Sequence, residues 1–172
     1  MPDADPSSLR DFAVLTDRLR PTLHRYCARI VGSAVDGEDV LQNAFLKATE
    51  SWPSVSSSLE NPEGWLFRIA HNAALDFLRG RVRHKVLHSD ENIDVVPAHF
   101  IAPDALGTRA SLQTLSRLPV TQRSAVVLRD VLGFGVEEIS RILEMTVPAV
   151  KGSLQRARQR LDQITREPED FQ

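Results

Sequence analysis

Apolar residues recur three and four positions apart along most of the chain, which is the spacing of amphipathic α-helices. The clearest case is residues 8–31, whose stripe consists of Phe12, Leu15, Leu19, Leu23, Cys27 and Ile30. Pro21 interrupts this stripe, so a kink or a division into two helices is expected there. Gly32 ends the pattern. Because no stretch reads convincingly as a strand, the sequence predicts an all-α protein.

Two more helices are expected in the first half of the chain. The segment SAVDGEDVLQNAFLKATESW places Val40, Leu41, Ala44, Phe45 and Ala48 on one face, and acidic residues crowd its first turn, where the helix dipole favours them. Residues 53–62 are serine-rich with a proline at each end, which predicts a loop. Asn61 is then expected to cap a helix that opens at Pro62. Its inner stripe is expected to be Leu66, Ile69, Ala73 and Phe77.

The helical periodicity fades between residues 86 and 107, where two prolines and four acidic residues occur. This composition predicts a linker between two small helical domains. We place the first domain at 8–85, the linker at 86–107, the second domain at 108–165 and an acidic tail at 166–172. The second domain is expected to contain helices over 108–117, 120–132, 136–144 and 147–165.

Composition excludes several classes of protein. The net charge of −2 predicts no global attraction to nucleic acid, so any such attraction must come from local patches. The single cysteine, Cys27, lies among apolar residues and is expected to be buried. The five histidines lack metal-ligand spacing, and no catalytic constellation is recognisable, so neither a metal, a cofactor nor an enzyme is predicted. A polar N-terminal segment and the absence of an apolar run of about 20 residues predict a cytoplasmic protein without membrane insertion.

The segment VEEISRILEMTVPAVKGSLQRARQR (136–160) has the parts of a helix-turn-helix. Ile139, Ile142 and Leu143 form the apolar face of a short first helix. Thr146 is a suitable cap for a second helix, and Pro148 is tolerated in its first turn. In this motif the second helix enters the major groove of DNA.

The outward face of that second helix carries the side chains that groove reading requires. Arginine pairs with guanine and glutamine with adenine, while flanking cations neutralise phosphates. A basic helix can also be simply a solvated face, but no acidic residue occurs between 147 and 161. Gly152 is expected to let DNA approach the backbone closely. The predicted DNA-binding residues are Ala149, Lys151, Gly152, Gln155, Arg156 and Gln159.

The stretch LSRLPVTQRSAVVLRDVLGFGVEEISRILEMTVPAVKGSLQRARQRL resembles the C-terminal domain of extracytoplasmic-function (group IV) sigma factors, which reads the promoter −35 element. The stretches GEDVLQNAFLKATESW and NPEGWLFRIAHNAALDFLRGRVR are similar to the N-terminal domain of the same family. The resemblance covers about residues 10–165, with both domains in the expected order. It implies a non-enzymatic factor that docks on core RNA polymerase, recognises the −10 and −35 elements and opens the duplex, here for a stress or envelope-response regulon.

The resemblance also implies residue roles in the first domain. Asp39, Gln42, Asn43 and Leu46 would bind the polymerase, although simple dipole complementation also explains the acidic residues at this helix start. Unstacked bases need aromatic or polar groups beside a cationic track. The residues expected to meet the −10 element are Ser57, Phe67, Arg68, His71, Asn72 and Arg79. Trp52 and Trp65 are expected to be core residues.

Two alternatives remain within this reading. A stand-alone helix-turn-helix regulator would bind duplex DNA without the polymerase, and a sigma mimic would sequester an anti-sigma factor without touching a promoter. The resemblance further implies a cognate anti-sigma factor as a partner. The acidic linker residues Asp90, Glu91 and Asp94 would lie near the catalytic cleft of the polymerase.

Overall fold

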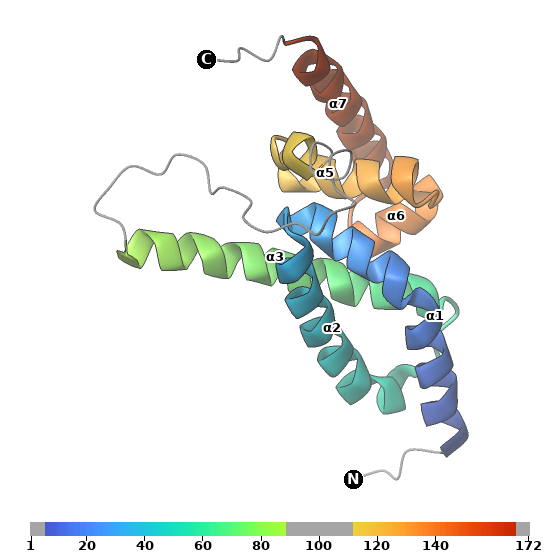
Figure 1. The fold of residues 1–172 in the computed structure, drawn as a ribbon. Coiled ribbons are helices and arrows are strands. Elements are labelled where there is room, and N and C mark those ends of the chain that lie inside the picture. Colours follow the sequence, from blue (N-terminus) through green and yellow to red (C-terminus); the bar gives the residue numbers. More distant parts are fainter. Residues whose placement is uncertain (1–5, 89–111, 168–172) are drawn as a thin grey trace.

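The computed structural model describes residues 6–88 and 112–167, and within these ranges it contains helices and no strand. Figure 1 shows their arrangement. The all-α prediction is therefore confirmed. The helices are α1 (Pro6–Val31), α2 (Ala34–Val55), α3 (Pro62–His88), a short helix at 112–116, α5 (Val120–Val126), the π-helical turn η1 (Val127–Val131), α6 (Val136–Leu143) and α7 (Val147–Arg166).

The first helix is continuous, so the expectation of two helices at Pro21 is wrong and the alternative of a kink holds. Figure 1 shows α1 changing direction along its length. A proline removes one backbone hydrogen bond and bends a helix without necessarily ending it when packing on both sides continues. The helix ends at Gly32, which has a φ of +82° and donates its N–H to the Ala28 carbonyl at 2.8 Å. Glycine takes this left-handed conformation without a steric penalty.

The second helix extends further than expected. Ser33 caps its start by accepting the Asp36 N–H at 3.2 Å, but the helix continues through Pro53 to Val55, so the loop predicted for 53–62 begins only at residue 56. Trp52 is buried, and its Nε1 donates to the Ser8 carbonyl at 2.8 Å. This anchor on α1 holds the last turn of α2 in helical form.

The start of α3 confirms the predicted cap, because Oδ1 of Asn61 accepts the Gly64 N–H at 2.9 Å. The helix then runs beyond the end expected for the domain, so residues 86–88 belong to α3 rather than to the linker. The rest of the linker lies outside the described residues. In Figure 1 the C-terminal half of α3 projects beyond the other helices.

Helices α1 and α2 cross at very short distance at Gly37. A Cβ built on Gly37 would lie 2.7 Å from both the Cα and the backbone nitrogen of Ala28. Helix backbones approach this closely only where no side chain intervenes. The glycine therefore sets the spacing of the first two helices.

We expect Gly37→Ala to lower the free energy of unfolding by about 1–3 kcal/mol, because the added methyl must push two backbones apart. Urea denaturation at constant pH measures this. Gly80→Ala is the matched control, since a Cβ there meets nothing within 4 Å. That control should leave stability unchanged or raise it by up to about 1 kcal/mol, as alanine is the better helix former. Equal effects at both positions would contradict the close-packing explanation.

The second set of helices forms the predicted helix-turn-helix. Glu144, at the turn, has a φ of +53°, and Thr146 caps α7 by accepting the Ala149 N–H at 3.3 Å. The helix expected over 120–132 is present, although its last residues, 127–131, form the π-helical turn η1. The buried apolar residues of α6 and α7 include Ile139, Ile142, Val150, Leu154 and Ala157.

The two helical units pack against each other and share one apolar core. The rings of Phe67 in α3 and Phe134 before α6 stand edge to face, with centroids 4.9 Å apart. The buried guanidinium of Arg123 in α5 donates to the Ile30 carbonyl near the end of α1, and to the Ser116 and Leu118 carbonyls at 3.1 and 3.0 Å. A buried cation is stable only when partners of this kind replace water. These contacts hold the second unit against α1 and α3.

Candidate nucleic-acid interface

Helix α7 presents its polar face outward while its apolar stripe is buried. Lys151, Gln155, Arg156 and Gln159 are exposed, and Ala149 and Gly152 are partly exposed. The structure thus brings all six predicted −35 residues to one accessible face. A face of cationic and amide side chains on the second helix of a helix-turn-helix suits the major groove. Contact with DNA remains a prediction for each of them.

Gly152 makes room for a neighbouring side chain in this structure. A Cβ at this position would lie 3.2 Å from Nη1 of Arg156, so the guanidinium lies over the glycine backbone. The space that the sequence suggested for DNA is thus occupied by Arg156 in the free chain.

The predicted −10 residues divide into two groups. Ser57, Arg68, Asn72 and Arg79 are exposed, whereas Phe67 and His71 are buried. The expectation that Phe67 and His71 meet unstacked bases is therefore corrected: both are core residues. The physical reason is that α3 is covered on two sides. Helices α1 and α2 cover one side and α6 covers the other, so a second stripe of α3 is buried in addition to the expected inner stripe.

The buried pair is well defined. Phe67 lies between Tyr26, at 5.8 Å between ring centroids, and Phe134. Nδ1 of His71 lies 2.8 Å from the Tyr26 hydroxyl. Burial, aided by the positive charge of Arg79, lowers the pKa of His71 to about 4. The imidazole is therefore neutral near pH 7.

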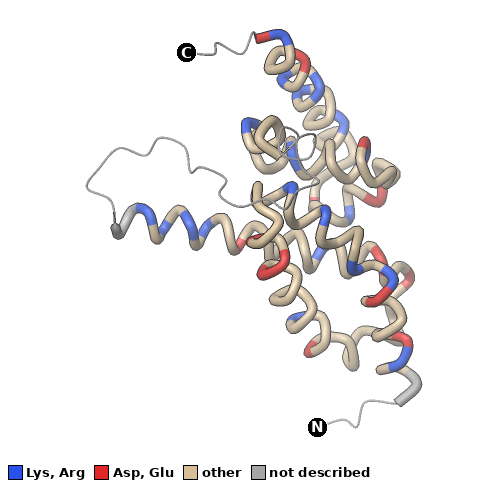
Figure 2. Tube along the Cα trace, in the orientation of Figure 1, with Lys and Arg blue, Asp and Glu red and all other residues tan. Residues whose placement is uncertain are grey.

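Several cations of α3 have partners within the molecule. Nε of Arg68 lies 3.2 Å from Glu144 at the turn of the helix-turn-helix. Arg81 pairs with Asp36 at 2.5 Å and covers the Phe77 ring, while Arg79 pairs with Asp76 at 3.5 Å. Figure 2 shows cationic positions along the outer half of α3 and along α7. The positive charges of Arg68, Arg79 and Arg81 are thus partly neutralised by their neighbours.

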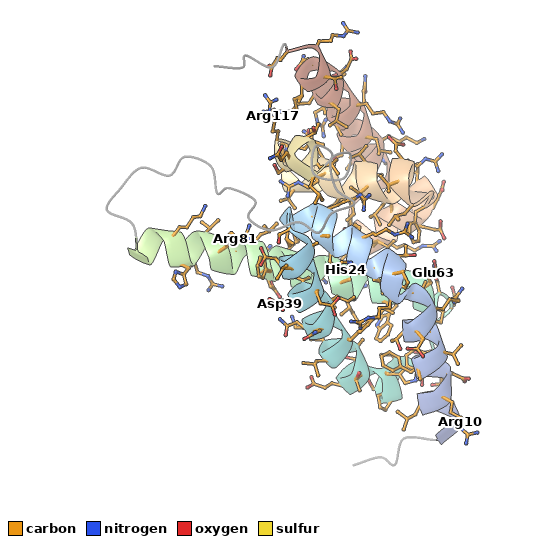
Figure 3. All side chains as sticks on the ribbon, viewed as in Figure 1. Arg10, His24, Asp39, Glu63, Arg81 and Arg117 are labelled. Carbon is orange, nitrogen blue, oxygen red and sulfur yellow. The ribbon has the colours of Figure 1, made fainter. Side chains whose placement is uncertain are left out.

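The predicted polymerase-binding residues form one exposed stripe on α2. Asp39, Gln42, Asn43 and Leu46 follow the spacing of a single helix face, and all four are exposed. Leu46 is 64% exposed, which is unusual for a large apolar side chain and typical of a protein contact surface. Figure 3 labels Asp39 on α2.

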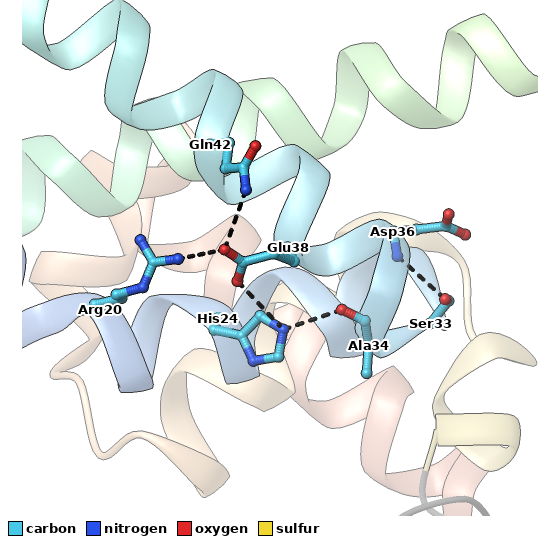
Figure 4. A network of polar contacts seen from close by, with 7 residues as sticks. All are labelled: Arg20, His24, Ser33, Ala34, Asp36, Glu38 and Gln42. Carbon is cyan, nitrogen blue, oxygen red and sulfur yellow. Dashed lines mark hydrogen bonds and ion pairs between the residues drawn. The ribbon is translucent and has the colours of Figure 1, made fainter. Parts of the chain in front are cut away.

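The acidic residues beside this stripe have structural roles. Glu38 pairs with Arg20, lies 3.9 Å from Nε2 of His24 and accepts a hydrogen bond from Gln42 at 3.4 Å (Figure 4). His24 also contacts the Ala34 carbonyl at 3.0 Å. These contacts fasten the start of α2 to α1, so of the acidic residues at this helix start it is Asp39 that is exposed for a partner.

The two tryptophans and the cysteine behave as core residues. Trp52 is buried, and Trp65 is partly buried against it with ring centroids 5.7 Å apart. Cys27 is buried, and burial raises its thiol pKa to about 12, which makes the thiol unreactive. Within residues 6–88 and 112–167, no three His, Cys, Asp or Glu side chains gather as metal ligands, and no helix is long and apolar enough to span a membrane.

One cation beside the outward face of α7 was not predicted from the sequence. Arg129 of η1 lines an open hollow together with Lys151, Gln155 and Gln159 of α7. The sequence did contain one signal, a cation shortly before the break at 133–135. In a helix-turn-helix, the helix that precedes such a break lies beside the recognition helix. The pattern within α7 alone contains no such information.

Comparison with known proteins agrees with this geometry. Residues 15–84 match the family described as Sigma-70 region 2, and residues 109–161 match Sigma-70, region 4. The chain is 32% identical over 162 residues to the ECF RNA polymerase sigma factor SigE of Mycolicibacterium smegmatis, covering 91% of this chain and 62% of that protein. It is 33% identical over 153 residues to SigM of Mycobacterium tuberculosis, covering 89% and 76%.

A solved structure shares the fold. The sigma factor RpoE of Bartonella quintana, determined in complex with the anti-sigma factor NepR, superposes with a TM-score of 0.72 at 24% identity, covering 92% of this chain and 99% of that chain. An exposed recognition helix, together with a first helical unit that matches region 2, defines a transcription initiation factor of the sigma-70 class. The chain belongs to the extracytoplasmic-function (ECF) RNA polymerase sigma factors. The family resemblance seen in the sequence is thereby confirmed.

Proposed function

We propose that this chain binds core RNA polymerase, directs it to promoters through a −10 and a −35 element, and so initiates transcription of a stress or envelope-response regulon. The observation that carries the proposal is the exposed face of α7 in a chain that also contains the region 2 domain. A stand-alone regulator needs no such domain. The protein acts by binding, in the cytoplasm, and not as an enzyme.

Each surface has a proposed role. Residues 8–88, extended from the expected 85 by the last residues of α3, form the docking and −10 domain, 89–107 the linker, 108–165 the −35 domain and 166–172 a tail. The stripe of Asp39, Gln42, Asn43 and Leu46 contacts the polymerase. The outward face of α7 reads the −35 element. For the −10 element, Ser57, Arg68, Asn72 and Arg79 remain candidates, since their side chains are exposed.

We also propose an anti-sigma partner. RpoE was solved with NepR, and CnrH with the cytosolic domain of CnrY, and both share this fold at 24% identity. In the packed arrangement described here, the exposed side chain of Arg68 pairs with Glu144 of the second unit, so this packing competes with a contact between Arg68 and DNA. A partner that stabilises this packing would keep the chain inactive.

The test is in vitro transcription with core polymerase, this chain and genomic DNA, followed by sequencing of transcript 5′ ends. Aligned start sites with two shared upstream elements are the expected result. A stand-alone regulator would show no stoichiometric binding to core polymerase in a pull-down. A sigma mimic would yield no run-off product.

Arg156→Ala is expected to weaken binding to a −35 duplex by about 1–3 kcal/mol, because one base-reading guanidinium is lost. Fluorescence anisotropy at fixed salt measures this. Arg10→Ala is a suitable control, since it removes one cation from the far end of the molecule (Figure 3).

Asn72→Ala should leave duplex binding unchanged and reduce promoter opening, measured by permanganate reactivity. Loss of both properties in one variant would contradict the proposed division of roles.

A further inference from the structure

Beside the recognition helix lies an open hollow of about 460 Å³ between η1 and α7. Its lining includes three cations, Arg129, Lys151 and Arg158, and two amides of the predicted −35 face, Gln155 and Gln159. Positions 151, 155, 158 and 159 are one helix face, so Arg158 belongs to the same surface as the predicted base-reading residues. A concave surface with this charge suits a phosphate of the DNA backbone.

Arg158 differs from the other exposed cations of α7 in how it is held. Its Nε donates to Oδ2 of Asp130 at 3.0 Å, and its Nη2 donates to Oδ1 at 2.6 Å. Both carboxylate oxygens are engaged, which is the two-bond geometry that only arginine forms with a carboxylate. Asp130 lies in η1, so the pair ties the recognition helix to the preceding turn. The hydrogen bond to Asp130 also raises the pKa of Arg158.

The pair leaves part of Arg158 available. The two bonds use one edge of the guanidinium, so the N–H groups of Nη1 remain free to donate to a further acceptor. The neighbouring Arg129 is fixed in turn, because its Nη1 donates to the Phe134 carbonyl at 2.9 Å. Two guanidiniums of this surface are thus held by the protein before any DNA is present.

An acidic residue on a DNA-binding face has an electrostatic cost, because it repels phosphates. Asp130 is 40% exposed and Arg158 is 53% exposed, so the pair gains little stability from burial. What the carboxylate does supply is a fixed position for Arg158. Phosphate contacts set the register in which the neighbouring side chains meet the bases.

We propose that Asp130 is a positioning residue for −35 recognition, because it holds Arg158 in place at the hollow. There Arg158, Arg129 and Lys151 bind a phosphate of the DNA backbone. The bound phosphate fixes the register in which Gln155 and Arg156 meet the bases. The inference rests on the proposed promoter recognition. It adds two residues outside the recognition helix, Arg129 and Asp130, to the DNA-binding surface. It also means that Asp130 increases sequence discrimination while it lowers the overall affinity for DNA.

The test compares affinities of the full chain for a −35 duplex and for a scrambled duplex of equal length. The −35 duplex is taken from the promoters recovered by transcript sequencing. Asp130→Asn should bind scrambled DNA more tightly, by about 2–5-fold at low salt, because a repelling charge is removed. The ratio of specific to scrambled affinity should nevertheless fall about fivefold, the lower end of the effect of one mismatched base pair.

Three further variants make the result specific to the pair. Arg158→Lys should lower the ratio to the same extent, because lysine cannot form the two-bond geometry. The double variant should show no further loss if the two residues act together. Asp162→Asn is the matched control: it removes a different carboxylate, which lies in α7 and pairs with Arg166 at 2.9 Å, and should leave the ratio unchanged.

Suppose that the ratio of specific to scrambled affinity is well above one in the wild type and is unchanged in Asp130→Asn. That result would overturn this inference and leave the proposed function intact. A wild-type ratio near one would overturn this inference together with the proposed reading of the −35 element by α7, whereas the failure of transcript sequencing to give aligned start sites would overturn the proposed function itself. Independent, additive losses in the double variant would show that Arg158 is not positioned by Asp130. Thermal unfolding of each variant checks that the helix-turn-helix is folded, and a purely structural role of the pair would change the melting temperature without changing the ratio.

Discussion

Replacing Phe67 by alanine is expected to lower the free energy of unfolding by about 3–5 kcal/mol, the range for a large aromatic side chain removed from a packed core. The ring is fully buried and contacts Tyr26 from the first unit and Phe134 from the second. Its loss therefore leaves a cavity at the junction of the two units. Because both units border this cavity, the change should weaken their packing as well as the helices themselves.

Chemical denaturation followed by circular dichroism measures this effect, and Phe67→Leu should lose less than the alanine variant because it fills most of the space. Promoter opening, assayed well below the unfolding midpoint, should be retained in both variants. If Phe67→Ala kept its stability and lost only promoter opening, the ring would be acting on DNA bases and its assignment to the core would be wrong.

A second large effect is expected from pH. The imidazole of His71 has a pKa of about 4 in the folded chain, against an ordinary value of 6.5. Between these values the unfolded chain binds the additional proton, so stability falls as the pH is lowered through this window. Above about pH 7 the contribution of His71 to the pH dependence vanishes. Each unit of difference is about 1.4 kcal/mol, so the loss by pH 4 is roughly 3 kcal/mol.

Unfolding by urea at several pH values between 4 and 8 tests this expectation. In His71→Gln the pH dependence over this window should be much shallower, because a neutral amide replaces the titrating ring beside Tyr26. His84→Gln, which makes the same substitution at an exposed position of α3, is the control, and because His71 is still present it should keep the loss of stability that His71 causes toward low pH. Equal slopes in wild type and His71→Gln would show that other groups cause the acid sensitivity.

Most of the helices could be predicted because their signals are local. The apolar stripe of α1, the cap at Asn61 and the cap at Thr146 each depend on residues within a few positions, and all three are present in the structure. The recognition face of α7 followed for the same reason. Errors occurred where distant residues intervene: Trp52 anchors α2 past Pro53 through Ser8, a partner 44 positions away.

The roles of Phe67 and His71 show why the candidate site was only partly predictable. Periodicity within α3 identifies one inner stripe, and it carries no information about a second layer that covers another face of the same helix. Likewise, nothing in the local sequence indicates that Asp130 meets Arg158, 28 positions later, or that Arg68 meets Glu144 across the two units.

The order of amino acids was thus sufficient for the helical class, the helix-turn-helix and the family, since these depend on short-range periodicity, caps and motif residues. Which polar side chains are exposed, paired or buried depends on how the helices pack. That packing brings together residues far apart in the chain, and the free energy of burying or pairing a group is set by those neighbours rather than by its place in the sequence.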